Sequence, residues 1–274
     1  MIVIAHRGDS AHRPEHTLAA YELAIENGAD FIEQDLVATR DGVLFARHEN
    51  EISGSTDVAA HPSLAGRRTV KEIDGRELTG WFTEDLTAAE LRTLRARERI
   101  PDVRPANAAY DGRFGIPSFD EVLALAERAG VGVYPETKHP AHFRALGIPL
   151  EEPLAAALRA HPGVPVFLQS FDADSLRRLA GLVDAPRIQL VSSRQGPQDL
   201  SAAGLRAIAG YAAGIGPSRN LVTPRLLADA HDAGLLVHVW TFRPEDDPDE
   251  LPRFLEMGVD GVFTDDPGAV RRSR

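Results

Sequence analysis

The amino-acid sequence predicts an α/β protein folded as a (β/α)8 TIM-type barrel. The chain has 274 residues, which is long for one ordinary domain but normal for a single barrel of this class. Strand-like and helix-like segments alternate along most of the chain, and eight principal strands can be counted. A doubly wound open sheet is the alternative architecture. We prefer the barrel because no glycine-rich dinucleotide-binding turn follows the first strand.

Each expected element follows from its local pattern. Short, mostly apolar runs predict strands at residues 2–5, 31–37, 43–46, 131–134, 164–168, 187–191, 212–215, 235–240 and 261–263. Helical patterns predict helices at residues 17–27, 119–129, 173–182, 199–208, 223–232 and 248–257, and after Pro267. Gly28 suits the end of the first helix. The pair Asp41-Gly42 suits a hairpin turn, so residues 43–46 are expected to pair with the second strand.

Residues 49–116 interrupt this regular pattern. The stretch contains several prolines, the turn Asp111-Gly112 and clustered arginines at positions 92, 95, 97 and 99. It is too long for a simple connection, so we expect a small insertion after the second strand unit that folds over the site. The whole chain, 1–274, is then a single domain. Residues 139–149 are rich in His and Pro and are expected to form a second long loop.

Composition excludes several classes of protein. The net charge of -11 argues against a non-specific nucleic-acid binder, which needs a basic surface. No apolar run approaches the ~20 residues that span a bilayer. The segment 1–5 leads straight into His6 and has no basic residues before it, so it resembles a first strand more than a signal peptide. We therefore expect a cytoplasmic protein without stable membrane insertion, compatible with either a monomer or a dimer.

Three carboxylates stand where buried strands are expected to end. Glu33 and Asp35 are two residues apart on one strand, so their side chains share a face, and Glu136 ends another strand. Such carboxylates repel one another unless a cation or a proton relieves them. The alternative is a solvated strand end, against which the apolar residues on both sides argue. Cysteine is absent, and all-oxygen ligation favours one divalent cation, Ca²⁺ or Mg²⁺, with Mn²⁺ also allowed.

Two histidines and two cations lie at neighbouring strand ends. His6 follows the first strand and His48 ends the hairpin, and an imidazole suits general acid/base catalysis because its pKa lies near neutrality. A structural role is the alternative for each histidine. Arg7 is suited to bind phosphate or to pair with a nearby carboxylate. Lys138 either pairs with Glu136 or contacts a phosphate.

Two further residues are candidates for substrate contacts. Gln169 ends the fourth strand, where it lines a pocket or satisfies local backbone groups. Trp240 ends the seventh strand, where it offers an apolar wall for a small organic group or packs within the protein.

Taken together, these residues resemble the glycerophosphodiester phosphodiesterase family. The shared segments follow the family's order over nearly the whole chain: Ala5-His6-Arg7-Gly8, Pro14-Glu15-His16-Thr17-Leu18, Glu33-Gln34-Asp35, Asp41-Gly42 before His48, Tyr134-Pro135-Glu136-Thr137-Lys138, Leu168-Gln169-Ser170-Phe171-Asp172, Gly214-Ile215-Gly216-Pro217, Val239-Trp240-Thr241 and Gly261-Val262-Phe263-Thr264-Asp265. The combined pattern is specific, although each motif alone is modest. One departure is Glu49-Asn50-Glu51 after His48, where the family commonly has an Asp-x-x-Leu-like run.

The resemblance implies a fold, an activity and a site. It implies a TIM-type barrel with an insertion after the second strand unit, and a metal-dependent enzyme that hydrolyses glycerophosphodiesters to sn-glycerol 3-phosphate and an alcohol. The nucleophile is either water or the glycerol 2-hydroxyl, which would first give a cyclic phosphate. The corresponding site residues are His6 and His48 for catalysis, Glu33, Asp35 and Glu136 for the metal, and Arg7 and Lys138 for the phosphate.

Two other functions stay open at this point. Related barrels act on phosphoinositides, sphingomyelin or lysophospholipids, so a phospholipase D-like or lysophospholipid phosphodiesterase is the enzymatic alternative. It would favour an apolar surface that meets a membrane, and the sequence shows no strong one. A metal-dependent binding protein is the other alternative. The pair His6 and His48 argues against it, because a receptor needs no acid/base pair.

Overall fold

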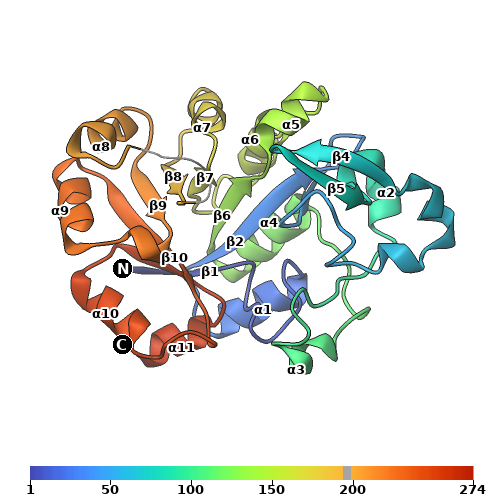
Figure 1. Cartoon of the computed structure of the whole chain (residues 1–274), viewed down its shortest axis with the longest axis horizontal. Coiled ribbons are helices and arrows are strands. Elements are labelled where there is room, and N and C mark those ends of the chain that lie inside the picture. Colours follow the sequence, from blue (N-terminus) through green and yellow to red (C-terminus); the bar gives the residue numbers. More distant parts are fainter. Residues whose placement is uncertain (194–198, 274) are drawn as a thin grey trace.

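Eight parallel strands close into a barrel in the computed structural model, which describes residues 1–193 and 199–273. The strands are β1 (Ile2–Ala5), β2 (Phe31–Ala38), β6 (Gly132–Thr137), β7 (Leu168–Ser170), β8 (Arg187–Val191), β9 (Gly214–Pro217), β10 (Leu236–Phe242) and β11 (Gly261–Thr264). Neighbours in space are neighbours in this order, and β1 pairs with both β2 and β11 (Figure 1). The predicted (β/α)8 barrel is therefore confirmed, and the open doubly wound sheet is excluded.

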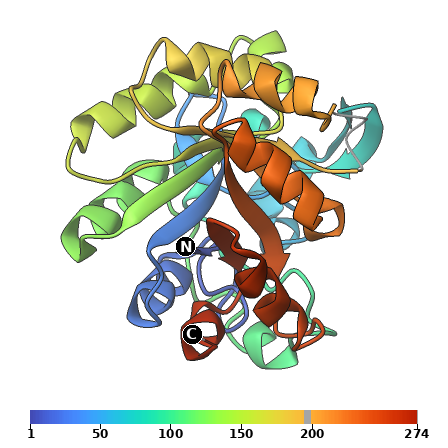
Figure 2. The same ribbon diagram turned by 90° about the vertical axis from the view of Figure 1, so that its left-hand side faces the viewer.

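Helices cover the outside of the barrel, as Figures 1 and 2 show. They are α1 (Leu18–Glu26), α4 (Phe119–Ala129), α5 (Pro140–Ala145), α6 (Glu151–Ala160), α7 (Ala173–Ala180), α8 (Ala202–Ala209), α9 (Pro224–Asp232), α10 (Glu250–Met257) and α11 (Pro267–Arg272). Local side chains define their ends. Thr17 accepts a hydrogen bond from the backbone of Ala20 at the start of α1. A capping box of Ser118 and Glu121 begins α4, which ends at a left-handed Gly130. Within the described residues, no helix is long and apolar enough to cross a membrane.

Two expectations for the middle of the chain were wrong. The strand expected at residues 164–168 is displaced to β7. Val166 makes only an isolated bridge to Val133 on β6, and neither Pro165 nor Pro135 has an N–H with which to extend this pairing. The loop expected at residues 139–149 contains α5, and α6 follows it without having been predicted. Pro140 occupies the first turn of α5, where a proline is tolerated because that N–H would have no helical partner.

Residues 49–116 lie between β3 (Leu44–Ala46), which pairs antiparallel with β2, and α4. They form η1 (Val58–Ala60), η2 (Pro62–Arg67), β4 (Thr69–Ile73), β5 (Arg76–Gly80), η3 (Thr83–Asp85), α2 (Ala88–Leu91) and α3 (Pro105–Ala108). In Figure 1 the β4–β5 pair lies beside α5. Two histidines connect this part of the chain to the β4–β5 turn and to η3. His139 Nδ1 lies 2.6 Å from Asp74 Oδ2, and His142 Nε2 lies 2.9 Å from Glu84 Oε1. The insertion is therefore held against the segment that follows β6.

Aromatic side chains fill the barrel interior. Tyr134 stacks on Phe167 with ring centroids 5.3 Å apart and meets Phe263 edge-on at 5.0 Å. The Tyr134 hydroxyl shares a hydrogen bond of 2.7 Å with His238 Nδ1. Burial lowers the pKa of His238 to about 4, against the opposing effect of Asp260. The imidazole is therefore neutral at pH 7 and contributes to the core as an uncharged ring.

Acidification is expected to destabilise the fold through His238. The unfolded chain protonates this residue near its ordinary pKa of 6.5 and the folded chain only near 4, so its contribution is complete above pH 6.5 and is lost as the pH falls towards 4. Between pH 7 and pH 5 the loss is about 2 kcal/mol of unfolding free energy. Urea unfolding at both pH values measures this free energy. Its decrease from pH 7 to pH 5 should be smaller for His238→Gln than for the unmodified protein. Equal drops would contradict the assignment.

Candidate active site

Polar side chains from six strands meet at one rim of the barrel. Parallel strands place their carboxyl ends on the same face, which is where active sites of this fold are built. The residues concerned are His6 after β1, Glu33 and Asp35 on β2, His48 after β3, Glu136 on β6 with Lys138 after it, Gln169 on β7 and Asp265 after β11.

Three buried carboxylates lie side by side at this rim. Asp35 is paired in register with Glu136 on the neighbouring strand, and Glu136 with Gln169 on the next. Gln169 Nε2 donates to Glu33 Oε1 at 3.1 Å. The backbone N–H of Arg7 donates to Glu33 Oε2 at 2.7 Å. The register of β2, β6 and β7 thus brings residues more than one hundred positions apart into one cluster.

The carboxylates repel one another in this position. Burial raises the pKa of Glu33 well above its ordinary value, and Asp35 raises it further, against the charge of Arg7. Burial raises the pKa of Glu136 to about 8, although Lys138 lowers it. Burial also opposes ionisation of Asp35, but Lys138 and other positive neighbours hold its pKa well below the usual range. The cluster therefore favours either bound protons or an added cation.

His16 adds a nitrogen atom to the carboxylate cluster. Its Nε2 lies 2.8 Å from Asp35 Oδ2, and its Nδ1 shares a hydrogen bond of 2.7 Å with the Tyr21 hydroxyl. One ligand atom from each of His16, Glu33 and Asp35 lies within 4.8 Å of the others, a spacing that suits a metal ion. Burial lowers the pKa of His16 to about 4, so the neutral ring is available as a hydrogen-bond donor.

Arg47 holds the loop that carries His16. Its side chain is fully buried, and it donates to the backbone oxygens of Glu15 at 2.6 Å and of His16 at 3.0 Å. It also donates to the backbone oxygen of Ser55 at 3.1 Å. The residue directly before His48 therefore connects the loop after β1 with the insertion.

Two cations border the carboxylates. Lys138 Nζ lies 3.0 Å from Glu136 Oε1 and 3.5 Å from Asp35 Oδ1. Arg7 Nη1 donates to a carboxylate oxygen of Glu15 at 2.8 Å. Arg7 has a left-handed backbone with φ 60°, a strained conformation of the kind that clusters at functional sites.

Gly8 makes the turn after Arg7 feasible. It has φ 86°, and a β-carbon there would lie 2.7 Å from the carbonyl carbon of Ala20. The pair Arg7-Gly8 therefore allows the loop after β1 to pack directly on α1.

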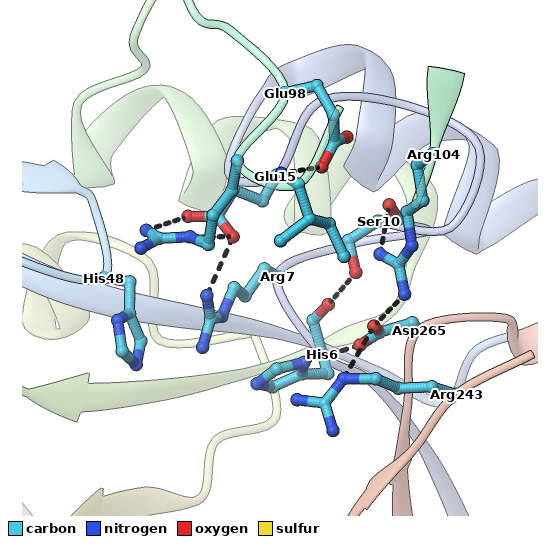
Figure 3. A pocket seen from close by; sticks show the side chains of 11 residues that line it. His6, Arg7, Ser10, Glu15, His48, Glu98, Arg104, Arg243 and Asp265 are labelled. Atoms are coloured by element: carbon cyan, nitrogen blue, oxygen red, sulfur yellow. Dashed lines mark hydrogen bonds and ion pairs between the residues drawn. The ribbon is translucent and has the colours of Figure 1, made fainter. Parts of the chain in front are cut away.

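Two imidazoles face one cavity of about 210 Å³ beside these groups. Its lining residues are His6, Arg7, Ser10, Glu15, His48, Glu98, Arg99, Ile100, Arg104, Arg243 and Asp265 (Figure 3). His6 Nδ1 lies 2.6 Å from Asp265 Oδ1, and His48 Nδ1 is hydrogen-bonded to the Glu49 carboxylate. In the part of the chain that the structure describes, neither Nε2 has a hydrogen-bond partner.

Burial sets the charge of both rings. It lowers the pKa of His6 from 6.5, with Arg7 acting in the same direction and Asp265 opposing it. It lowers the pKa of His48 to about 3, again with Arg7 contributing. Both imidazoles are therefore neutral near pH 7 in the free protein, and each has an Nε2 able to accept a proton.

The sequence of this chain matches a known family. The model of the glycerophosphoryl diester phosphodiesterase family matches residues 6–269. The chain belongs to this family. A glycerophosphodiester phosphodiesterase of Arabidopsis thaliana is 35% identical, and the match covers 97% of this chain and 84% of that protein. A glycerophosphodiester phosphodiesterase of Bacillus subtilis is 32% identical, with the same two coverages, 97% and 84%. The family recognised from the sequence motifs is thus confirmed.

Solved structures resemble this glycerophosphoryl diester phosphodiesterase family member in fold. A Silicibacter pomeroyi protein assigned as a glycerophosphoryl diester phosphodiesterase gives a TM-score of 0.80 at 27% identity, covering 100% of this chain and 92% of that chain. An Oleispira antarctica phosphodiesterase, solved in complex with its product sn-glycerol-3-phosphate, gives 0.78 at 22% identity and covers 100% and 96%. The second likeness supports the barrel fold alone.

Most of the residues singled out from the sequence of this family member come together. His6, Arg7 and His48 line the cavity, and the adjoining cluster holds Glu33, Asp35, Glu136, Lys138 and Gln169. Trp240 lies outside this cluster. Its Nε1 donates to the Gly216 backbone oxygen at 2.6 Å, and its ring meets Phe171 edge-on at 5.8 Å. Phe171 in turn lies 5.9 Å from Lys138 Nζ, so the aromatic pair borders the site through Phe171.

Sequence reasoning missed several residues around the cavity of this phosphodiesterase family member. They are Glu15, His16, Glu49, Arg99, Arg104, Arg243 and Asp265. Asp265 could have been predicted from the sequence, because it directly follows the last strand. Glu136, which was predicted, stands at the end of an earlier strand. Glu49 was marked only as a departure after His48. The insertion arginines were noticed as a cluster, but nothing in their spacing distinguishes Arg99 from its exposed neighbours.

Proposed function

We propose that this chain hydrolyses glycerophosphodiesters to sn-glycerol 3-phosphate and an alcohol, in a reaction that depends on a divalent cation. The observation that carries the proposal is the cavity in which the imidazoles of His6 and His48 lie beside Arg7 and next to a cluster of buried carboxylates. Family membership supports the reaction class. The Oleispira antarctica phosphodiesterase of the same fold was solved with its product sn-glycerol-3-phosphate, and the proposal extends this product to the present chain. The proposal includes a small-molecule substrate and a cytoplasmic location.

Glu33, Asp35 and Glu136 are the residues that would hold the cation. When all three carboxylates are ionised, their charges and those of Arg7 and Lys138 sum to one negative charge, and a bound divalent cation would change this to one positive charge. That balance suits a phosphodiester, which carries a single negative charge. The donor set is rich in oxygen and fits Ca²⁺, Mg²⁺ or Mn²⁺.

Two residues that contact these carboxylates support this assignment. Gln169 Oε1 is buried near Glu33 and has no hydrogen-bond partner among the described residues. His16 donates to Asp35 when it is neutral, and this contact keeps that carboxylate oriented. When bound, the cation would supply Lewis-acid stabilisation of the charge that develops on the phosphoryl oxygens.

In this proposal, the protein's own side chains bind the phosphate and transfer the protons. Arg7 binds a non-bridging phosphate oxygen through its guanidinium. One imidazole Nε2 takes a proton from the nucleophile. The other imidazole must first bind a proton from solvent at its own Nε2, and it then gives that proton to the leaving alkoxide. Lys138 provides a positive charge on the other side of the carboxylates. In this scheme Gln169 fixes Glu33, and Trp240 with Phe171 forms an apolar wall at the edge of the substrate site.

The test is release of product by the metal-stripped protein. Glycerophosphocholine is supplied with Ca²⁺, Mg²⁺ or Mn²⁺ in separate reactions, and sn-glycerol 3-phosphate is followed by a coupled dehydrogenase assay. We expect release with at least one cation and none without. Activity only on lysophospholipid vesicles would favour the lipid alternative. Equal release with and without cation would overturn the proposed carboxylate site while leaving the reaction class.

A further inference from the structure

We propose that Arg99 and Arg104, both from the insertion, are positioning residues that hold the two catalytic imidazoles in one reactive tautomer. Each arginine acts through a carboxylate that is bonded to Nδ1 of one histidine. The inference rests on the proposed function, because it explains how His6 and His48 are prepared for proton transfer. We use the name His6 dyad for His6 with Asp265, and His48 dyad for His48 with Glu49.

In the His6 dyad, an ionised carboxylate determines where the imidazole proton lies. Asp265 is buried, and Arg104 Nη2 donates to its Oδ2 at 2.7 Å while Oδ1 faces His6 Nδ1 at 2.6 Å. Burial opposes the charge, but His6, Arg243 and Arg104 hold the pKa of Asp265 well below its ordinary value. An ionised carboxylate can only accept hydrogen bonds, so Nδ1 of His6 must be the donor. The lone pair of Nε2 is then free towards the cavity.

Besides Asp265, two other parts of the barrel rim fix Arg104. Its Nη1 donates to the backbone oxygen of Ser10 at 2.9 Å, and its Nε and Nη2 donate to Glu245 at 2.8 and 3.0 Å. Ser10 Oγ also donates to the backbone oxygen of His6 at 2.9 Å. In Figure 3 Arg104 and His6 contact different oxygens of the Asp265 carboxylate. One guanidinium of the insertion therefore restrains both the carboxylate and the loop that carries the imidazole.

The His48 dyad is built in the same way. Glu49 binds His48 Nδ1 with one oxygen, and its Oε2 lies 2.7 Å from Arg99 Nη2. Burial opposes ionisation of Glu49, but His48 and Arg99 lower its pKa to about 2. Nδ1 of His48 must therefore donate as well. Arg99 also makes two bonds to Glu15, of 2.6 and 3.0 Å, and Glu15 accepts from Arg7, so this arginine is held on both sides.

The two arginines are five positions apart on one irregular segment, 98–104. Glu98 stabilises this segment, because its Oε1 accepts from the backbone N–H of Ile100 at 2.9 Å and its carboxylate also binds Asn107. Segment 98–104 borders the cavity and contacts both dyads. The insertion is thus part of the proton-transfer apparatus, and the two imidazoles are oriented together when this segment is in place.

Steady-state kinetics separate positioning from substrate binding. With glycerophosphocholine, Arg99→Met and Arg104→Met are each expected to lower kcat by about 10–100-fold, with KM changed much less. Arg104→Lys should recover part of the loss and move the pH profile of kcat back towards that of the unmodified protein. Arg97→Met is the matched control, since Arg97 is in the same stretch but its side chain is 53% exposed and pairs with Asp111. Unchanged kcat in both Met variants, or a loss confined to KM, would overturn the inference.

Imidazole NMR tests the inference without turnover. With ¹⁵N-labelled histidine, long-range proton–nitrogen spectra assigned through His6→Gln and His48→Gln should show the Nδ1–H tautomer for both residues. Arg104→Met should mix the tautomers of His6 only, and Arg99→Met those of His48 only. Spectra that do not change in either variant would refute the positioning role. If the unmodified protein cleaves no glycerophosphodiester, the proposed function fails, and these spectra still decide the inference.

Discussion

Replacing His6 or His48 by alanine is expected to lower kcat with glycerophosphocholine by about 10³-fold or more in each case. Each imidazole lies at the cavity with an Nε2 that has no partner among the described residues, so each substitution removes one proton-transfer group. The barrel should survive, because neither ring belongs to the hydrophobic core. Thermal unfolding and cation titration calorimetry should therefore give values close to those of the unmodified protein.

A surface histidine provides the control for this pair. His231 on α9 has a side chain that is 41% exposed and pairs with Asp260 away from the cavity, so His231→Ala should keep full activity. Near-normal kcat in either His6→Ala or His48→Ala would refute that residue's role. Loss in one variant alone would mean that a single imidazole serves both proton transfers.

Changing Glu136 to glutamine is expected to weaken cation binding by at least about 100-fold and to abolish activity at low cation concentration. The substitution keeps the shape of the side chain and an oxygen that can accept from Lys138, so the main change is the loss of one charge from the cluster. High cation concentrations should restore part of the rate. Titration calorimetry with Mn²⁺, Mg²⁺ and Ca²⁺ measures the affinity, and product release measures the rescue.

A second cluster with metal-like spacing gives a matched control. Asp9, His12 and Asp266 also bring ligand atoms within 4.8 Å of one another. In that cluster, however, Asp9 is already bonded to His12 and Asn27, and Asp266 caps α11. Asp9→Asn should leave the cation requirement unchanged. If Asp9→Asn abolished cation binding and Glu136→Gln did not, the cation would belong to this second cluster instead.

The rim residues were predictable because strands are periodic. The spacing of Glu33 and Asp35 places both side chains on one face, and parallel pairing then brings Glu136 alongside. Contacts between side chains on irregular segments follow no such repeating pattern in the sequence. Arg104 and Asp265 are 161 positions apart, and no repeating pattern relates a residue of the insertion to one after the last strand. The predicted bounds of the fourth strand were wrong near Pro165, where two prolines on neighbouring strands, Pro135 and Pro165, have no N–H to donate to the ladder.

The alternatives for individual side chains could be resolved only in three dimensions. Lys138 was expected either to pair with Glu136 or to contact a phosphate. It pairs with Glu136 and also lies beside the proposed phosphate site, so both roles are compatible with its position. Gln169 contacts Glu33, and Trp240 packs on Phe171; neither contact could be read from a position at a strand end. What a polar residue contacts depends on loops whose paths are fixed by tertiary packing.

The pairing of the first strand with the last has a consequence for biosynthesis. β1 is made before the other strands of the barrel and β11 after them, and Asp265 is made 259 residues after His6. At about 5–20 residues per second, the nascent chain carries an incomplete barrel for some tens of seconds. During that interval one edge of β1 has no partner and His6 has no carboxylate beside it. Catalytic competence is therefore acquired only after β11 has been made and closes the ring.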